Sequence, residues 1–452
     1  MSIIDLELDT YKQNFESKAI NKEMYGEVHT DFVLVHKILD LLPGYIFTNP
    51  NLKWLDPCAG RGYFPMILYK RLFISLQNTI KDPKKRHDHI ITNMIYMVEI
   101  NLEHISSLYY IFGENANIAH MDFLDMVGLT FDIIIGNPPF NANGVKKVPT
   151  NRHISKKKDG VSIWVDFLMH SVNSIKKKGW IAMITPSIWL KRDHRFHGYF
   201  SDRGEIYKLH CMTNSETNTI FHKQAQTPTT YFAFNKGPSK KINIYDSILK
   251  TYISCDTLPS FPLISPSIIQ KLDVFVKKAG HLNVIKTSMR PGYKGLCVVN
   301  VPDQKHPFKN VSTCILQHLT PELVINYSNK ECSYHGIQPK LILAHKMYGF
   351  PYLDTNGYGL SNRDNYIIKD YTLDQLKYIK KFLTTKLAFV VFESTRYRMK
   401  YLERYAFEYM PDITKLKDFP KNITDENAAN YFNFTSMERK YIDNIIKREY
   451  IQ

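Results

Sequence analysis

The sequence lacks long apolar runs and ordered sets of cysteines. No segment approaches the roughly 18 apolar residues of a membrane span, and the N-terminal MSIIDLELDTYKQNFESK has no signal-peptide core. The six cysteines are scattered, without a CxxC pair or a cysteine-histidine cluster at zinc-ligand spacing. These absences predict a reducing, cytoplasmic location without secretion, no membrane partner, no disulfide framework and no metal.

Composition indicates a folded chain with an anionic partner. At 452 residues, 44% of them hydrophobic, the chain is too long for one core and predicts two globular domains. Lys and Arg number 59 against 43 Asp and Glu, a formal net charge of +16. This excess favours nucleic acid as the partner, although solvated surface lysines would give the same balance.

The sequence pattern divides the chain into two parts. From residue 30 to about 236, six short apolar segments read as strands: KWLDP, MIYMVEI, NIAHMDF, FDIIIGNPP, GWIAMITP and TPTTYFAFNK. Helical patterns lie between them, including residues 161–179, which Gly179 is expected to end. The alternation predicts an α/β fold, a doubly wound Rossmann-like sheet in a domain spanning residues 1–240. Residues 241–452 predict a mixed α+β domain with hairpins and two helical stretches.

The first strand runs into a glycine turn, LDPCAGRGYF at residues 55–64. Gly60 and Gly62 let a ligand approach the backbone, and Asp56 adds a carboxylate at the strand end. The turn lacks the third glycine of a dinucleotide fingerprint and the GKS of a phosphate loop. An acidic turn without a phosphate cradle suits a cationic ligand bearing hydroxyls, such as S-adenosylmethionine, although plain tight turns look similar.

Two further strand ends carry acidic residues. Glu99 ends the second strand, where a carboxylate can accept both ribose hydroxyls of a nucleoside. Asp122 and Phe123 follow the third strand, and we expect them to accept from an adenine amino group and to pack on its ring. Each residue alone could be an ordinary strand end, but their order within one sheet favours a nucleoside site.

The fourth strand ends in FDIIIGNPPF, residues 131–140, where a proline pair stops the ladder. With the glycine turn and the acidic strand ends, this stretch resembles the DNA adenine-N6 amino-methyltransferases of type II restriction-modification systems, which have an Asn-Pro-Pro-aromatic signature. The resemblance implies that Asn137 and Pro138 offer oxygen acceptors to the target amine, Pro139 holds the turn rigid and Phe140 stacks on a flipped base.

Other matches to this family extend over most of the chain. They follow its gamma-like order, with cofactor motifs first and the target-recognition region last. Thr30 matches a threonine that contacts the methionine part of S-adenosylmethionine, although Asp31 stands where a proline is usual. Phe221 matches a second base-stacking ring by position, with ordinary core packing as its alternative. Cys58 follows a proline, as the nucleophile of cytosine-C5 methyltransferases does, but it lies in the cofactor turn.

Two basic segments are candidate DNA contacts, with solvated or core roles as the alternatives. They contain Lys156, Lys157 and Lys158 in a polar loop after the catalytic turn, and Arg396, Lys400 and Arg404 at a spacing that would form a stripe on a helix.

The predicted function is site-specific methylation of adenine N6 in double-stranded DNA, with S-adenosylmethionine as cofactor and a separately encoded restriction endonuclease as a possible partner. Glutamine-N5 methylation of protein is the nearest alternative, because a carboxamide presents the same two hydrogens. DNA cytosine-N4 methylation is chemically equivalent but goes more often with Ser-Pro-Pro.

Overall fold

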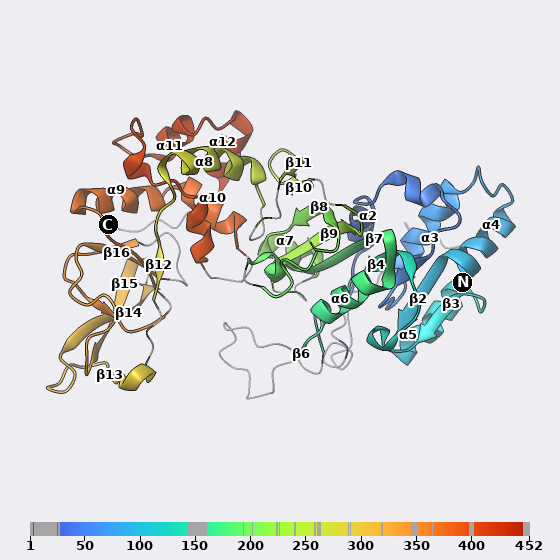
Figure 1. Ribbon diagram of the computed structural model, residues 1–452, viewed down its shortest axis with the longest axis horizontal. Coiled ribbons are helices and arrows are strands. Elements are labelled where there is room, and N and C mark those ends of the chain that lie inside the picture. The colour runs from blue at the N-terminus through green and yellow to red at the C-terminus, as the bar shows by residue number, and fades with distance from the viewer. Residues whose placement is uncertain are drawn as a thin grey trace. The chain divides into compact units, whose positions relative to one another are not determined.

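The computed structural model forms two compact units (Figure 1), Met1–Tyr245 with Tyr252–Ser260, and Asp246–Thr251 with Phe261–Gln452. The residues it describes are 3, 25, 28–142, 161–192, 194–200, 202–222, 225, 227–238, 241–256, 259, 264–287, 289, 291–317, 320–344, 351–363, 365–396 and 402–445. The boundary predicted at residue 240 precedes two strands that join the sheet of the first unit. That unit therefore extends past the predicted boundary.

A doubly wound sheet forms the first unit, which confirms the predicted class. Its strands are β1 (Trp54–Asp56), β2 (Ile95–Glu99), β3 (Asn117–His120), β4 (Phe131–Gly136), β7 (Ile175–Pro186), β8 (Glu205–Cys211), β9 (Thr229–Asn235), β10 (Ile242–Asp246) and β11 (Thr251–Cys255). Within the described ranges their order is β11-β10-β8-β9-β7-β4-β1-β2-β3. Strands β3, β2, β1, β4 and β7 pair in parallel, whereas β9 is antiparallel to β7 and β8. The carboxyl ends of β1 to β4 consequently meet at one edge.

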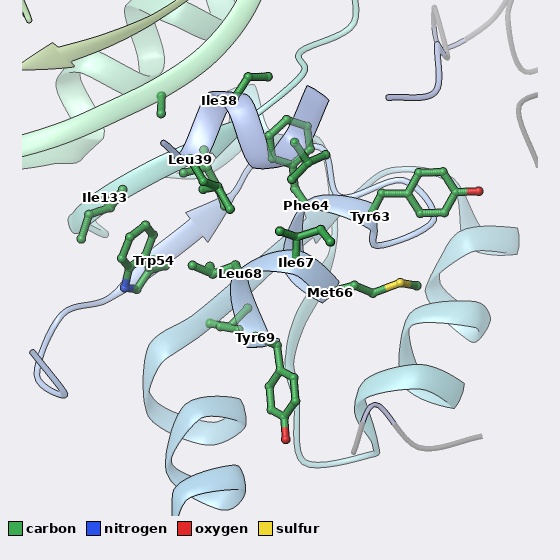
Figure 2. Packing of buried hydrophobic residues seen from close by; sticks show 14 of the residues in the cluster. Ile38, Leu39, Trp54, Tyr63, Phe64, Met66, Ile67, Leu68, Tyr69 and Ile133 are labelled. Atoms are coloured by element: carbon green, nitrogen blue, oxygen red, sulfur yellow. The ribbon is translucent and has the colours of Figure 1, made fainter. Parts of the chain in front are cut away.

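The helices of the first unit differ in the side chains that they bury. They are α2 (Phe32–Leu39), α3 (Tyr63–Ser75), α4 (Pro83–His89), α5 (Leu102–Phe112), α6 (Trp164–Ser174) and α7 (Asn214–Ile220). Of these, α2, α3, α5 and α6 bury apolar side chains, whereas α4 buries Arg86 and α7 buries Thr217. Figure 2 shows Trp54 of β1 and Ile133 of β4 in the core beside Leu68 of α3, and all three side chains are at most 1% exposed. Asp31 caps α2 by accepting from the Leu34 N–H at 2.6 Å, so an N-cap occupies the place where the family usually has proline.

The six predicted strands are present, and two local features differ from the expectation. Helix α6 ends at Ser174 rather than at Gly179, because Ile175 already pairs with β4 and Lys176 forms an ion pair with Asp132 at 2.9 Å. A Cβ on Gly179 would lie 2.9 Å from the Asp132 carbonyl, so this glycine permits close strand pairing. Strand β8 was not predicted, because a register shift between Ile206 and Lys208 breaks its alternating pattern.

Two small sheets and a set of helices form the second unit, a mixed α+β fold. The strands are β12 (Ile285–Lys286), β13 (Val298–Val299), β14 (Phe308–Gln317), β15 (Thr320–Ser328), β16 (Lys340–Ala344), β17 (Pro351–Asp354), β18 (Gly359–Leu360) and β19 (Asn365–Ile368). In the described part of this unit they form the sheets β12-β19-β16-β17 and β13-β15-β14-β18. The helices are α8 (Pro266–Ala279), α9 (Leu373–Leu383), α10 (Lys386–Ser394), α11 (Asp425–Tyr431) and α12 (Ser436–Asn444).

The predicted hairpin and helices of this unit are present, but the basic helical stripe is not. Antiparallel pairing joins β14 to β15 and β16 to β17. Helix α10 ends at Ser394, Leu402 and Glu403 are not helical, and Arg404 begins the 3-10 helix η6 (Arg404–Tyr409). Arg396 and Arg404 therefore do not lie on one helix, and Lys400 lies outside the described residues.

Candidate active site

A cavity of about 360 Å³ lies at the carboxyl edge of β1 to β4. Nine of the residues predicted from the sequence line it: Thr30, Gly60, Glu99, Asp122, Phe123, Asn137, Pro138, Pro139 and Phe140. They come from four strand ends and from the segment before α2, so the parallel sheet brings together side chains more than a hundred residues apart. Asp56, Gly62 and Phe221 do not line it.

The glycine turn is shaped for close approach and tight packing. Gly60 and Gly62 both have left-handed φ angles, +52° and +85°. A Cβ on Gly62 would lie 3.0 Å from a methyl carbon of Leu108 and 3.1 Å from the Phe112 ring. Gly62 therefore serves the packing of the turn on α5, while Gly60 faces the cavity.

Glu99 is buried at 7% exposure and braces the turn. Its Oε2 accepts from the Gly60 N–H and its Oε1 from the Asn101 N–H, both at 2.7 Å. The His104 Nδ1 lies 3.8 Å from Oε1. The carboxylate thus has a structural task in addition to the predicted ligand contact, and each oxygen keeps a further lone pair for a hydroxyl group.

The third strand end places an acid beside an aromatic ring. Asp122 caps the 3-10 helix η3 (Phe123–Asp125) by accepting from the Leu124 N–H at 2.9 Å. The Phe123 ring is 1% exposed and contacts the rings of Phe167 at 5.5 Å and His170 at 4.6 Å between centroids. Acid and ring line one wall of the cavity, as a purine site requires.

The catalytic turn holds the Asn137 carboxamide in one orientation. Its Nδ2 donates to the Thr30 hydroxyl at 2.9 Å and to the Val28 carbonyl at 3.2 Å. Because a backbone carbonyl can only accept, the atom facing Val28 must be the NH2 group. Oδ1 then points the other way, is buried, and has no hydrogen-bond partner among the described residues. A buried carbonyl without a donor is unfavourable unless a ligand supplies one.

Phe140 and Phe221 lie edge to face, with ring centroids 6.5 Å apart. Phe140 is half-buried and lines the cavity, but Phe221 is 1% exposed and belongs to the hydrophobic core. Phe221 therefore packs against Phe140 and does not present a face to a base. This position corresponds to the core-packing alternative for Phe221.

Asp56 lies behind the glycine turn rather than in the cavity. It is 3% exposed and accepts from the Cys58 N–H at 3.1 Å. Burial raises the pKa of Asp56 to about 8. The hydrogen bond from the Cys58 N–H acts to lower this pKa, and the nearby Glu99 carboxylate acts to raise it. The geometry therefore gives no support to the predicted direct contact between Asp56 and the ligand.

Cys58 lines the cavity and donates its thiol to the Asn137 backbone carbonyl at 3.3 Å. Burial and the nearby Asp56 and Glu99 carboxylates hold the pKa of this thiol well above its ordinary value. A protonated thiol is a poor nucleophile, so the structure gives no support to Cys58 as a nucleophile of the cytosine-C5 type. Its hydrogen bond was not predicted, because it joins residues 79 positions apart.

The predicted DNA contacts receive little geometric support. Lys156, Lys157, Lys158 and Lys400 lie outside the described residues. Arg396 forms an ion pair with Glu393 at 3.1 Å and its side chain is 15% exposed. Arg404 is exposed, with its guanidinium 5.2 Å from the centre of the Tyr405 ring.

Across the described ranges, no group of three His, Cys, Asp or Glu side chains could hold a metal ion. No helix in the described part of the chain is long and apolar enough to cross a membrane.

A family model matches part of the first unit. Residues 66–219 match the family model described as Eco57I restriction-modification methylase, which confirms the predicted resemblance over this segment. An uncharacterized adenine-specific methylase of Mycoplasma pneumoniae is 34% identical over 84 residues, 18% of this chain and 20% of that protein. A Methanocaldococcus jannaschii protein provisionally described as a type II restriction enzyme and methyltransferase is 41% identical over 59 residues, 13% of this chain and 5% of that protein.

The matches to the two relatives cover small parts of both proteins. The chain spans at most a fifth of the length of the two relatives. Among solved structures, the M protein of the type I restriction enzyme EcoKI has 16% identity and a TM-score of 0.38, covering 50% of this chain and 49% of that chain. Values this low carry no argument about function.

Proposed function

We propose that this chain is a site-specific DNA methyltransferase that moves a methyl group from S-adenosylmethionine to N6 of an adenine flipped out of duplex DNA. The observation that carries the proposal is the unpartnered, buried Oδ1 of Asn137 at the wall of a cavity that also holds Glu99 and Asp122. The matched methylase model and the adenine-specific relative support the same chemistry.

The cavity fits a nucleoside with positive charge. Two carboxylates and the Phe123 ring line it, and Arg61 is the single lysine or arginine among its described lining residues. Glu99 would accept from ribose hydroxyls, Asp122 from the adenine amino group, and Thr30 would lie near the methionine part. When bound, S-adenosylmethionine supplies a methyl group on a sulfonium, which needs no activation beyond orientation.

Asn137 and Pro138 would activate the target amine. The exocyclic nitrogen of adenine is a poor nucleophile, since its lone pair is delocalised into the ring. Asn137 Oδ1 and the Pro138 carbonyl can accept its two hydrogens and draw the nitrogen toward tetrahedral geometry, which directs the lone pair at the incoming methyl group. Both residues are held beforehand, Asn137 by Thr30 and Val28 and Pro138 by its ring, so little reorganisation is needed.

Phe140 would receive the flipped base. Extruding an adenine costs a few kcal/mol, and stacking on an aromatic ring returns about 1 to 3 kcal/mol. Phe221 would hold that ring from its edge. Stacking on one half-exposed ring does not offset the whole free-energy cost of extruding the base. We assign the remaining stabilisation to contacts with the DNA backbone.

The second unit would read the target sequence. Its separate fold and the positive charge of the chain support a DNA target-recognition domain over about residues 241–452, and suggest cytoplasmic action on duplex DNA. Lys156, Lys157, Lys158, Arg396, Lys400 and Arg404 remain proposed contacts. A separately encoded restriction endonuclease is the proposed partner.

The decisive test is the product. Purified protein, S-adenosylmethionine and duplex DNA of mixed sequence should yield N6-methyladenine, detected by mass spectrometry of digested nucleosides and located by sequencing. N4-methylcytosine, or methylglutamine in an added protein substrate, would identify one of the two alternatives. A protein that binds S-adenosylmethionine but modifies none of these substrates would refute the proposal.

A further inference from the structure

The peptide bond between Asn137 and Pro138 has a single hydrogen-bonding group. Proline carries no N–H, so this peptide plane offers only the Asn137 carbonyl. Rotation of the plane sets where the Asn137 side chain begins and where the Pro138 carbonyl points. Whatever binds the Asn137 carbonyl therefore helps to fix both proposed acceptors of the target amine, together with the contacts of the Asn137 side chain to Thr30 and Val28.

The Cys58 thiol is the group that binds it. The Sγ atom lies 3.3 Å from the Asn137 carbonyl oxygen. Among the described residues, this is the one hydrogen bond that directly joins the glycine turn, residues 57–62, to the catalytic turn, residues 137–140. The glycine turn is fixed in its own right, because Glu99 holds Gly60 and Asp56 holds the Cys58 N–H.

The thiol is suited to act as a permanent donor. Its neighbours Asp56 and Glu99 are acids, and burial with their influence keeps the pKa of Cys58 well above the usual thiol range. The proton consequently stays on sulfur at neutral pH, where a thiolate would repel the carbonyl oxygen.

Resting on the proposed function, we propose that Cys58 is a positioning residue for methyl transfer: its thiol locks the Asn137–Pro138 peptide to the cofactor turn and aligns both acceptors with the site of methyl transfer. The residue takes no part in bond making and acts through Asn137 and Pro138. Its removal should slow the chemical step and leave binding intact.

Three variants separate this role from packing. In Cys58→Ala the donor is lost, and kcat for DNA methylation should fall about three- to tenfold, the value of one modest hydrogen bond. The dissociation constant for S-adenosylmethionine by calorimetry and the KM for DNA should stay within about twofold. Cys58→Ser restores a donor and should recover most of kcat. Cys211→Ala, a buried cysteine away from the cavity, is the control for loss of a buried thiol and should leave kcat unchanged.

An infrared measurement makes the test independent of turnover. The difference spectrum between wild type and Cys58→Ala should contain an S–H stretching band shifted to lower frequency, as expected for a hydrogen-bonded thiol. An unshifted band overturns the inference, even if the wild type proves inactive on DNA and the proposed function fails.

Kinetic results can also overturn it. With an active wild type, an unchanged kcat in Cys58→Ala excludes a positioning role. A parallel loss of kcat, cofactor affinity and melting temperature that serine does not restore would assign Cys58 to packing alone.

Discussion

The two units treat their buried charges differently. In the first, Asp56 and Glu99 are 3% and 7% exposed, and neither forms an ion pair with a lysine or arginine among the described residues. In the second, Lys340 and Asp354 meet at 2.6 Å with both side chains fully buried. Buried acidic groups without a lysine or arginine partner are typical of ligand sites, whereas a closed ion pair serves the fold.

Asp412 of the second unit is also closed by partners, whereas the fully buried Asp246 accepts from the N–H groups of Ile248, Leu249 and Ser267. Asp412 accepts from the hydroxyls of Tyr371 at 2.9 Å and Thr414 at 2.6 Å, and pairs with Lys415 at 2.9 Å. Burial alone would raise the pKa of Asp412, but these partners hold it below the ordinary value. The contrast supports the reaction site proposed in the first unit, while Lys340, Asp354 and Asp412 help to give the second unit a defined shape.

The largest expected effect lies in the second unit. Lys340→Met leaves Asp354 buried without its cation and should lower the free energy of unfolding by about 3 to 5 kcal/mol. Urea unfolding followed by fluorescence measures this loss. Lys277→Met removes one side of an exposed pair and should cost less than about 1 kcal/mol. Equal stability of both variants would show that the buried pair is not structural.

Asn137→Ala tests the first unit and removes its unpartnered acceptor. We expect kcat for DNA methylation to fall about a hundred- to a thousandfold, as when a preorganised polar group is removed from a reaction site. The variant also loses the Nδ2 hydrogen bonds to Thr30 and Val28, so its stability should fall by about 1 to 3 kcal/mol, whereas its affinity for S-adenosylmethionine should change little. A variant that keeps most of its turnover would remove Asn137 from the reaction.

Much of the first unit could be predicted because its signals are local. Strand β4 and its Asn-Pro-Pro turn follow from one apolar run and two prolines, and Glu99 and Asp122 follow from strand ends. The parallel sheet then brings these ends together without further information. Eight of the nine lining residues lie at these strand ends, whereas Thr30 was predicted only through the family resemblance.

The features that could not be predicted depend on contacts between distant segments. The sequence does not show that Asp56 lies behind its turn, that Phe221 is closed into the core, or that the Cys58 thiol meets Asn137. Strand β8 was missed because a bulge disrupts its alternation, and Lys176 was placed in a helix because its partner Asp132 is 44 residues earlier. The pairings of the small sheets in the second unit likewise follow from contacts that have no local signal.

Asp56→Asn should change how stability depends on pH. The folded pKa of Asp56 is about 8, against an ordinary value of 3.8. As pH rises, the unfolded chain therefore releases the Asp56 proton before the folded chain does. Between pH 3.8 and about 8 this difference lowers the free energy of unfolding, and above about 8 it lowers it no further. Relative to the variant, wild type should lose roughly 2 to 3 kcal/mol from pH 5.5 to 7.5. Thermal unfolding of both proteins across this range measures the difference, and parallel curves would show that Asp56 ionises normally.

Glu99→Gln has the smallest expected effect and tests whether the open carboxylate in the first unit belongs to the ligand site. Both Glu99 oxygens accept backbone N–H groups, at Gly60 and Asn101, and a glutamine would turn its NH2 toward one of these donors. The turn should loosen and affinity for S-adenosylmethionine should fall about tenfold, near 1.4 kcal/mol, in a calorimetric titration. Glu103→Gln, an exposed neighbour on α5, should leave affinity unchanged. Equal affinity of the Glu99→Gln and Glu103→Gln variants for S-adenosylmethionine would show that Glu99 does not contribute to ligand binding. The contrast between the buried acidic groups of the two units would then no longer identify the ligand site.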